Sequence, residues 1–340
     1  MPPALPKLSY VLLSHNREKY IRAAIESAFA QDYEGELEYI FSDDCSTDRT
    51  FDIIKECVAA YKGNRRVVVT QTPRNLHLAG NTNHAVQFVE SDWVIRADDD
   101  DYSSIDRCSI IAQAIAKHPA ASYIVTKVCY FVNDNEAEVR VQSQKRANAP
   151  CTFQLRSDQE TVFDCATYSY KAWHIRTYRN FPPLHPQGYY VDDFVCYYRS
   201  RVLGLGVFVN SSPLVYARAQ HDNMSSGGIA RACSYSDIIA LERFNNKYNN
   251  ITLLPIIELR NCIASHSENQ TSSNSVQLLR ELDNEIKQRT LLSSYWKKGS
   301  INRLRIRKAL GYTGLFSLIR CLPLPLFALC MSFYRKLRNR

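Results

Sequence analysis

Val94-Ile95-Arg96-Ala97-Asp98-Asp99-Asp100-Asp101-Tyr102 joins an apolar lead to four consecutive aspartates. Four adjacent carboxylates repel one another, and aspartate favours neither helices nor strands. A divalent cation would offset this repulsion, because carboxylate oxygens suit Mg²⁺ or Mn²⁺ and magnesium commonly takes only one or two of them beside water and phosphate. The alternative is a solvated acidic turn. The surrounding sequence helps to decide between these two interpretations.

Strand-like and helix-like segments alternate around this stretch. Short apolar runs predict four strands, at Leu8–Leu13, Leu37–Phe41, Val67–Thr70 and Trp93–Ile95. Apolar residues at helical spacing predict helices between them, over about 20–29, 53–58 and 81–89. This alternation predicts an α/β fold with a mostly parallel central sheet flanked by helices.

The unusual polar clusters all lie where the predicted strands end. They are Ser14–Arg17, Asp43-Asp44, Arg74 and Asp98–Asp101. Because ligands bind outside the carboxyl ends of such strands, the coincidence favours a binding site over an acidic turn.

The net charge of +8 is unevenly distributed. Residues 287–340 contain thirteen Lys or Arg and no Asp or Glu, which leaves −5 on residues 1–286. An acidic body with a basic tail is not typical of a nucleic-acid-binding domain, so no nucleic-acid partner is expected. In the tail, cations flank the apolar stretch 315–334, which predicts peripheral membrane contact through residues 297–340, with docking on protein as the alternative.

The cysteines and the N-terminus bear on location. The eleven cysteines are scattered without metal-ligand spacing, which favours reduced thiols, and the first residues have no apolar signal segment. The expected location is therefore cytoplasmic, on the inner face of the membrane.

Two further segments have both functional and structural interpretations. Aromatic, His and Asp residues gather over 168–194 and suit a saccharide acceptor surface, with Trp173, His174, Tyr190 and Asp192 as candidates. The alternative is a small core beneath a loop. The polar loop that begins at His221 equally fits a plain surface turn. Residues 133–150 are predicted to be a polar connection.

These motifs resemble the family 2 glycosyltransferases, which have a nucleotide-sugar-binding fold called GT-A. The resemblance runs from about Leu8 to Ser226. Ser14-His15-Asn16-Arg17 is similar to the family's T-Y-N-R motif, and Ser42–Asp48 is similar to its D-D-x-S-T-D signature. The second aspartate of that signature binds the nucleobase, which implies this role for Asp44.

The phosphate and metal motifs are similar as well. Arg74-Asn75-Leu76-His77 resembles the R-N-x-G segment near the phosphates, with histidine at the glycine position. The aspartate run, Asp98–Asp101, resembles the D-x-D metal motif. Its register is set by Asp106-Arg107, which resembles the P-x-R-L helix start. The resemblance then implies that Asp100 binds Mn²⁺ or Mg²⁺ with help from Asp98, and that Asp98 and Asp99 also contact the donor.

The C-terminal motifs imply the chemistry. Asp193, six residues before Arg199, resembles the general base of the E-D-x-x-x-x-x-R motif, with Asp192 replacing the glutamate. Tyr216–Ser225 resembles the closing Y-R-x-H-x-x-N-x-S segment. Gln220 stands at its histidine position, whereas His221 fits as a metal ligand only after a one-residue shift. No Q-x-x-R-W motif of processive polymerases occurs.

The resemblance therefore implies metal-dependent, inverting transfer of a single sugar from a nucleoside-diphosphate sugar. The expected acceptor is a saccharide or lipid-linked saccharide, in bacterial-type surface polysaccharide or glycolipid synthesis. The expected domains are a GT-A domain at 1–230, with a nucleotide half at 1–110 and an acceptor half at 111–230, and a helical region at 231–340. The alternative is a membrane-tethered, non-catalytic scaffold with a degenerate nucleotide-sugar pocket.

Overall fold

The computed structural model describes residues 5–131, 136–145, 152–155, 171–184, 192–218, 256–265, 276–284 and 286–287. The chain divides into two compact units, one of residues 1–219 with 266–278 and one of residues 220–265 with 279–340. Each unit is described by itself. The predicted domain boundary at residue 230 stays a prediction.

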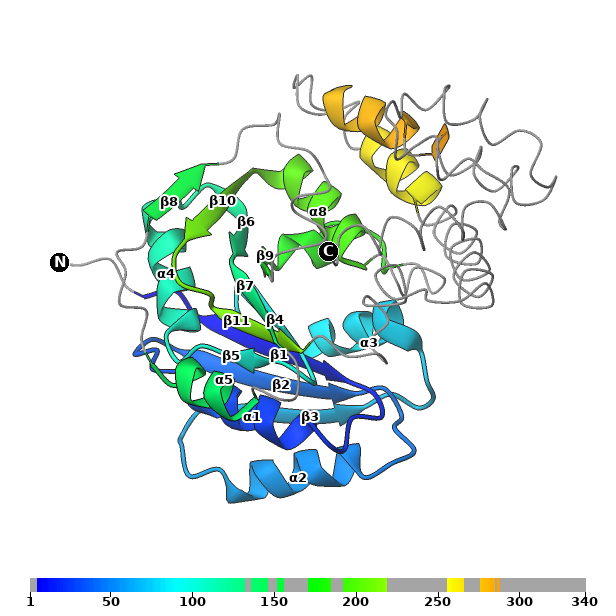
Figure 1. Cartoon of the computed structure of the whole chain (residues 1–340). Helices are drawn as coiled ribbons and strands as arrows, with labels where there is room; N and C mark the ends of the chain where they lie inside the picture. Colours follow the sequence, from blue (N-terminus) through cyan, green and yellow to red (C-terminus); the bar gives the residue numbers. More distant parts are fainter. Residues whose placement is uncertain are drawn as a thin grey trace, which may run out of the picture. The chain divides into compact units, whose positions relative to one another are not determined.

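The first unit is built on an eight-stranded sheet with the order β3-β2-β1-β4-β9-β6-β10-β8 (Figure 1). The strands are β1 (Leu8–Ser14), β2 (Leu37–Asp43), β3 (Val67–Gln71), β4 (Trp93–Asp98), β6 (Ala121–Thr126), β8 (Thr152–Leu155), β9 (Lys171–His174) and β10 (Leu205–Asn210). Strands β3, β2, β1 and β4 are parallel neighbours, whereas β9 is antiparallel to β4 and β6, and β8 is antiparallel to β10. The prediction of a mostly parallel sheet is confirmed.

A small second sheet has the order β5-β11-β7. It consists of β5 (Tyr102–Ser103), β7 (Val128–Phe131) and β11 (Val215–Arg218). Because β5 follows the aspartate run directly, this small sheet positions the residues after the run.

Helices cover both faces of the large sheet (Figure 1). They are α1 (Ile21–Phe29), α2 (Thr50–Ala60), α3 (His77–Ala85) with the 3₁₀ turn η1 (Val86–Phe88), α4 (Arg107–Lys117), α5 (Glu136–Ser143), α7 (Arg176–Arg179) and α8 (Asp192–Leu203). Alternate residues of β1, Leu8, Tyr10 and Leu12, share one buried core with apolar residues of α1, α2 and α4. Their neighbours point the other way, and α3 contacts β1 and β2 while α8 contacts β6, β9 and β10.

Two segments differ from the sequence prediction. Residues 133–150 were expected to be a polar connection, but helix α5 forms within them. The strand-like sequence over 122–132 is divided in the structure, because β6 and β7 lie in different sheets and are separated at Lys127. In both cases contacts to other elements, rather than the local pattern, decide the structure.

The described part of the second unit is helical. Residues 256–265 form one helix, and Arg260 Nε donates a 2.9 Å hydrogen bond to Oδ1 of Asp283 in the helical residues 279–284. No helix among the described residues is long and apolar enough to cross a membrane. The tail at 297–340, with its predicted membrane contact, lies outside the described residues.

Trp173 provides a test of the core. Its side chain is 0% exposed in β9, beside the ring of Tyr123 at 6.1 Å between centroids. We expect Trp173→Ala to lower the free energy of unfolding by about 3–5 kcal/mol because it removes a large buried ring. Tyr130→Ala is the control, since Tyr130 is 52% exposed and its replacement should change stability by less than about 0.5 kcal/mol. Equal stability of both variants in urea unfolding would contradict the placement.

Candidate active site

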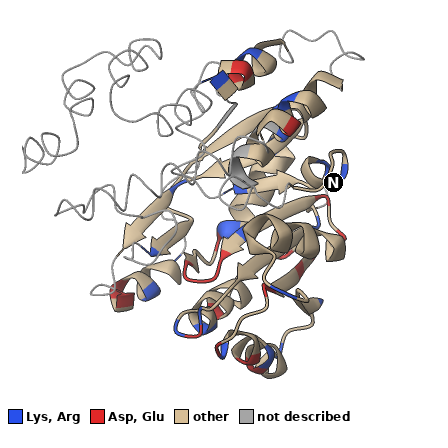
Figure 2. Cartoon of the chain, turned by 90° about the vertical axis from the view of Figure 1, so that its right-hand side faces the viewer, with Lys and Arg blue, Asp and Glu red and all other residues tan. Residues whose placement is uncertain are grey.

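Four parallel strands bring the predicted polar clusters to one edge of the large sheet. In the strand register Ser14 lies beside Asp43, Asp43 beside Gln71, and Leu13 beside Asp98. The carboxyl ends of β1, β2, β3 and β4 are therefore adjacent. Figure 2 shows acidic and basic residues interspersed over the described elements, and several of the charged side chains at this edge pair with one another.

His15 connects three of these clusters. Its backbone N–H donates to Asp99 Oδ2 at 2.9 Å, and its Nδ1 lies 2.9 Å from the carbonyl oxygen of Asp44. Because a carbonyl only accepts, Nδ1 carries the proton, and Nε2 accepts from Asn75 Nδ2 at 3.0 Å. The Asn75 amide is oriented by His77, whose backbone N–H donates to Oδ1 at 2.9 Å. The imidazole is thus held in one orientation by hydrogen bonds to both ring nitrogens.

Asp43 has a structural place at the end of β2. It is fully buried, and its carboxylate accepts from the backbone N–H of Ser46 at 2.9 Å and from Gln71 Nε2 at 2.8 Å. The Ser14 hydroxyl also donates to it, at 3.3 Å. Asp43 therefore shapes the loop that carries its neighbour Asp44.

Asp44 keeps one carboxylate oxygen available to a ligand. The residue is 3% exposed, and Oδ1 accepts from Thr72 Oγ1 and from the backbone N–H of Leu76, both at 2.8 Å. Oδ2 takes no hydrogen bond from the described residues. It can accept one from an N–H group of a planar base without loss of any internal contact.

The aspartate run is only partly neutralised by arginines. Arg17 Nε lies 3.6 Å from Asp99 Oδ1 and 3.9 Å from Asp100 Oδ2, while Arg96 lies 3.2 Å from Asp98 Oδ1. Burial, and next the charge of Asp98, raises the pKa of Asp100 to about 6 despite the opposing arginines. Burial and the charge of Asp100 raise the pKa of Asp99 well above its usual range. Added positive charge would favour the ionised forms of both carboxylates.

The carboxylate oxygens of the aspartate run fit a hard cation that keeps coordination positions open for water and phosphate. Asp98 and Asp100 supply carboxylate oxygens, and Mg²⁺ commonly takes only one or two of these and completes its shell with water and phosphate. Among the described residues, no three His, Cys, Asp or Glu side chains are grouped as a complete metal site. His221, the third predicted ligand, lies outside the described residues. The predicted metal site therefore stays a prediction.

Three residues at this edge have left-handed backbone conformations. The φ angles of Asn16, Cys45 and His77 are 54°, 54° and 60°. Glycine adopts this region without a steric cost, whereas every residue with a Cβ has one, although asparagine and histidine occur there more often than most. His77 therefore has the conformation that suits the glycine of the R-N-x-G pattern, although its residue type differs.

The remaining predicted residues fall into two groups. The Arg74 side chain is exposed beside the strand ends, where a phosphate could reach it. Asp192 and Asp193 begin helix α8, but their side chains and all of Tyr190 lie outside the described structure. The acceptor prediction does not fit Trp173, because its fully buried ring has no face for a sugar. His174 is half-buried, and burial, then Arg176, lowers the pKa of its imidazole.

Sequence reasoning missed Arg218 and Glu136. Arg218 Nε donates to the backbone carbonyl of Asp100 at 3.2 Å, and its terminal nitrogens pair with Glu136 at 2.8 Å. The available signal for Arg218 was the arginine of the Y-R-x-H-x-x-N-x-S segment, which falls on residue 218 when Asn223 is aligned. Nothing in the local pattern around Glu136 indicated its role.

Comparisons with known proteins agree with this geometry. The model of Glycosyl transferase family 2 matches residues 9–170. A protein of Bacillus subtilis named putative glycosyltransferase EpsE is 32% identical over 126 residues, which cover 37% of this chain and 44% of that protein. The poly(ribitol-phosphate) beta-N-acetylglucosaminyltransferase TarS of Staphylococcus aureus is 32% identical over 114 residues, 33% of this chain and 19% of that protein. The chain thus spans less than half of these relatives.

Solved structures extend the likeness to most of the chain. Residues 1–349 of S. aureus TarS, crystallised with UDP-GlcNAc, superpose with a TM-score of 0.58 at 17% identity, over 97% of this chain and 92% of that one. The same fragment crystallised without that ligand gives 0.55 at 16% identity, over 97% and 91%. At this identity the likeness establishes the fold, and the prediction of the GT-A fold is confirmed.

Asp100→Asn tests the electrostatics of the run. A carboxyl whose pKa is raised on folding stabilises the fold below about pH 4 and loses that contribution as the pH rises through about 6. Without metal, we expect the free energy of unfolding of Asp100→Asn to exceed that of the wild type by about 1–3 kcal/mol at pH 7 and to equal it at pH 4. Urea unfolding in EDTA measures both. Asp52→Asn is the control, because Lys55 lowers the pKa of Asp52 and the amide should not stabilise. The same difference at both pH values would contradict the expectation.

His77→Gly tests the left-handed backbone. Glycine carries no Cβ penalty at φ 60°, so we expect His77→Gly to be about 1 kcal/mol more stable than His77→Ala. Both variants remove the imidazole, so the comparison isolates the backbone. Chemical denaturation of the two variants measures it, and an alanine variant that matches the glycine variant would exclude the strain.

Proposed function

Since residues 9–170 belong to glycosyl transferase family 2, we propose that this chain transfers one sugar from a nucleoside-diphosphate sugar to an acceptor hydroxyl. The observation that carries the proposal is the grouping of Asp44, Arg17 and the aspartate run at one sheet edge of a GT-A fold. At this edge, Asp44 offers an oxygen that can accept a hydrogen bond from a nucleobase, Arg17 offers positive charge for phosphate, and the aspartate run offers carboxylates for a metal ion.

The nucleotide binds across the strand ends. Asp44 Oδ2 accepts a hydrogen bond from a ring N–H of the base, because Oδ1 is already occupied by Thr72 and Leu76. The His15 ring lies beside Asp44 and contributes a flat surface to the nucleobase site. Arg17 and the exposed Arg74 offer positive charge to the diphosphate.

The aspartate run holds the donor's charged end. A Mn²⁺ or Mg²⁺ ion held by Asp100, with help from Asp98, would supply positive charge against the leaving diphosphate. Asp99 accepts from the His15 backbone at 2.9 Å and lies 3.6 Å from Arg17, so it links this end of the donor to the base site. His221 is a further candidate for the same group through its predicted place in the closing motif.

Asp193 is the proposed general base. It lies at the start of α8, and Arg199 further along that helix donates to the carbonyl of Pro182 at 2.8 Å, which fixes α8 against the preceding segment. The Asp193 carboxylate takes the proton from the acceptor hydroxyl as that oxygen attacks the anomeric carbon. A single displacement from the face opposite the diphosphate inverts the configuration. His174, Tyr190 and Asp192 are the remaining candidates for acceptor contact.

The acceptor is proposed to be a saccharide or lipid-linked saccharide of surface polysaccharide or glycolipid synthesis. The support is the basic and apolar composition of residues 297–340, which suits peripheral contact with anionic lipid on the cytoplasmic face. The absence of a processive motif in the sequence supports the addition of a single sugar.

Incubation with Mn²⁺ and a panel of radiolabelled nucleotide sugars tests the proposal. UDP-GlcNAc heads the panel because the fold neighbour TarS was crystallised with it. We expect slow release of free sugar from one donor, since water can replace the acceptor. Tight nucleotide binding without any turnover, with or without candidate acceptors, would favour the non-catalytic scaffold.

Asp193→Asn tests the assignment of Asp193 as the general base. The amide cannot take the proton, so we expect transfer to fall by at least about 10³-fold, while metal-dependent nucleotide binding stays within twofold of the wild type. Calorimetric titration with the nucleoside diphosphate provides the binding control. Normal turnover of this variant would overturn the assignment of Asp193.

A further inference from the structure

Arg218 is a buried cation behind the aspartate run. It ends strand β11, is 2% exposed, and forms two parallel hydrogen bonds of 2.8 Å with the carboxylate oxygens of Glu136. The guanidinium carbon lies 4.5 Å from the ring centre of Tyr20 and 4.7 Å from that of Phe131. The charge, the fork geometry and the aromatic surroundings hold this side chain in one orientation.

The opposite side of Arg218 faces the run itself. Its Nε donates to the backbone carbonyl of Asp100 at 3.2 Å, and its backbone N–H donates to Asp101 Oδ1 at 2.9 Å. The backbone of one aspartate and the side chain of the next are thereby tied to β11. Because four adjacent carboxylates repel one another, such ties oppose spreading of the run.

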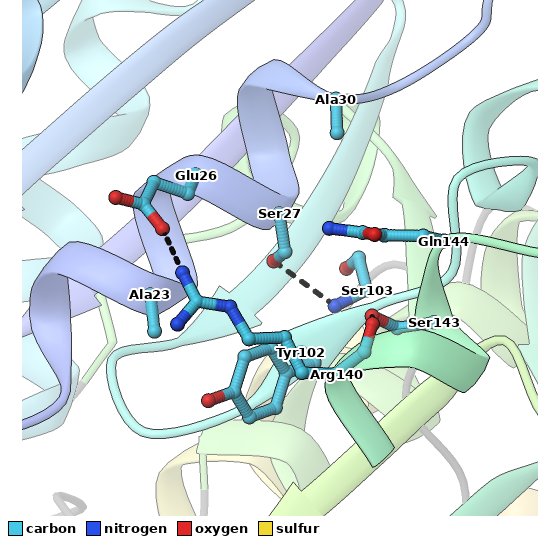
Figure 3. A pocket seen from close by; sticks show the side chains of 9 residues that line it. All are labelled: Ala23, Glu26, Ser27, Ala30, Tyr102, Ser103, Arg140, Ser143 and Gln144. Carbon is cyan, nitrogen blue, oxygen red and sulfur yellow. Dashed lines mark hydrogen bonds and ion pairs between the residues drawn. The ribbon is translucent and has the colours of Figure 1, made fainter. Parts of the chain in front are cut away.

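Glu136 is placed by helix α5, which is itself anchored on both sides. Arg140 follows Glu136 by four residues, so both lie on one face of the helix, and Arg140 forms an ion pair with Glu26 of α1. Figure 3 shows Arg140 reaching past Tyr102 to Glu26 at the wall of a small pocket between α1, α5 and β5. The Tyr102 hydroxyl donates to Glu136, and the Ser143 carbonyl accepts from the backbone N–H of Ile105 at 2.8 Å. Helix α5 is thus fixed to the residues that follow the run.

We propose that Glu136 and Arg218 are positioning residues for the aspartate run, which fix the backbone at Asp100 so that its carboxylate faces a divalent cation and the donor diphosphate. The inference rests on the proposed function of that carboxylate and adds two residues to it. The pair acts through the backbone of a ligand residue and touches no substrate. Its effect is therefore on cation affinity and on the chemical step.

The fork of Arg218 explains why this position needs arginine. Two terminal nitrogens serve Glu136 while the third nitrogen serves the Asp100 carbonyl, and a lysine ammonium cannot span both partners in this planar arrangement. A merely structural ion pair would need no contact with the run. The Asp100 contact distinguishes a positioning role from general stabilisation.

The test measures Mn²⁺ affinity, thermal stability without metal, and kcat in three variants. Glu136→Gln removes the charge that orients Arg218. The double variant Glu136→Met with Arg218→Met replaces the pair by apolar side chains, which commonly preserves folding where a lone buried charge does not. Lys55→Ala is the matched control, because it removes an exposed ion pair with Asp52 on helix α2, which has no part in placing Arg218 or the run. Affinity is measured by electron paramagnetic resonance of free Mn²⁺ with UDP present.

We expect Glu136→Gln and the double variant to raise the Mn²⁺ dissociation constant at least tenfold and to lower kcat at saturating Mn²⁺, while Lys55→Ala changes each by less than twofold. If Glu136→Gln does not fold, the double variant decides. A folded double variant that binds Mn²⁺ within twofold of the wild type would overturn the inference and leave the proposed function intact. A wild-type chain that binds neither Mn²⁺ nor any nucleoside diphosphate would overturn both.

Discussion

Repulsion among the four carboxylates of Asp98–Asp101 is the constraint on which the rest of the site depends. Local propensity does not favour the run. Burial at the end of β4, and next the charge of a neighbouring aspartate, raises the pKa of Asp99 and of Asp100. The fold keeps the run in place by contacts from several directions. Arg17 approaches from the β1 side, and Arg218 approaches from β11.

The same edge of the sheet also contains residues with energetically unfavourable backbone conformations. Three residues adopt left-handed backbone angles directly beside the buried Asp43 and the constrained His15 ring. Strained residues persist only where surrounding contacts determine them, and they concentrate where a ligand must approach the backbone closely. At Cys45 such contacts come from Asp43, whose carboxylate accepts hydrogen bonds from the backbone N–H of Ser46 and from Gln71 Nε2. Strain and charge crowding therefore occur together at the proposed donor site.

Elements that lie far apart in the sequence complete the site from behind. Helix α5 contributes Glu136, and strand β11 of the small sheet contributes Arg218, which binds Glu136. In the same sheet β11 pairs with β5, which follows the run directly, and with β7. The segment of α5 has a polar sequence with little helical periodicity, so its helix depends on ion pairs to α1 and β11 rather than on a broad apolar face. Its existence could not be predicted from the local pattern.

The sequence by itself determined the strands β1, β2, β3 and β4 and their alternation with helices, because each of these strands is a short apolar run that ends at a polar cluster. It also made the aspartate run and Asp44 candidates for a site, since adjacent carboxylates need a reason that local structure does not supply. Only the tertiary structure decided that Trp173 lies in the core, and that Glu136 and Arg218 meet behind Asp100. Those outcomes depend on pairings between residues 50 or more positions apart, and periodicity carries no information about such distant contacts.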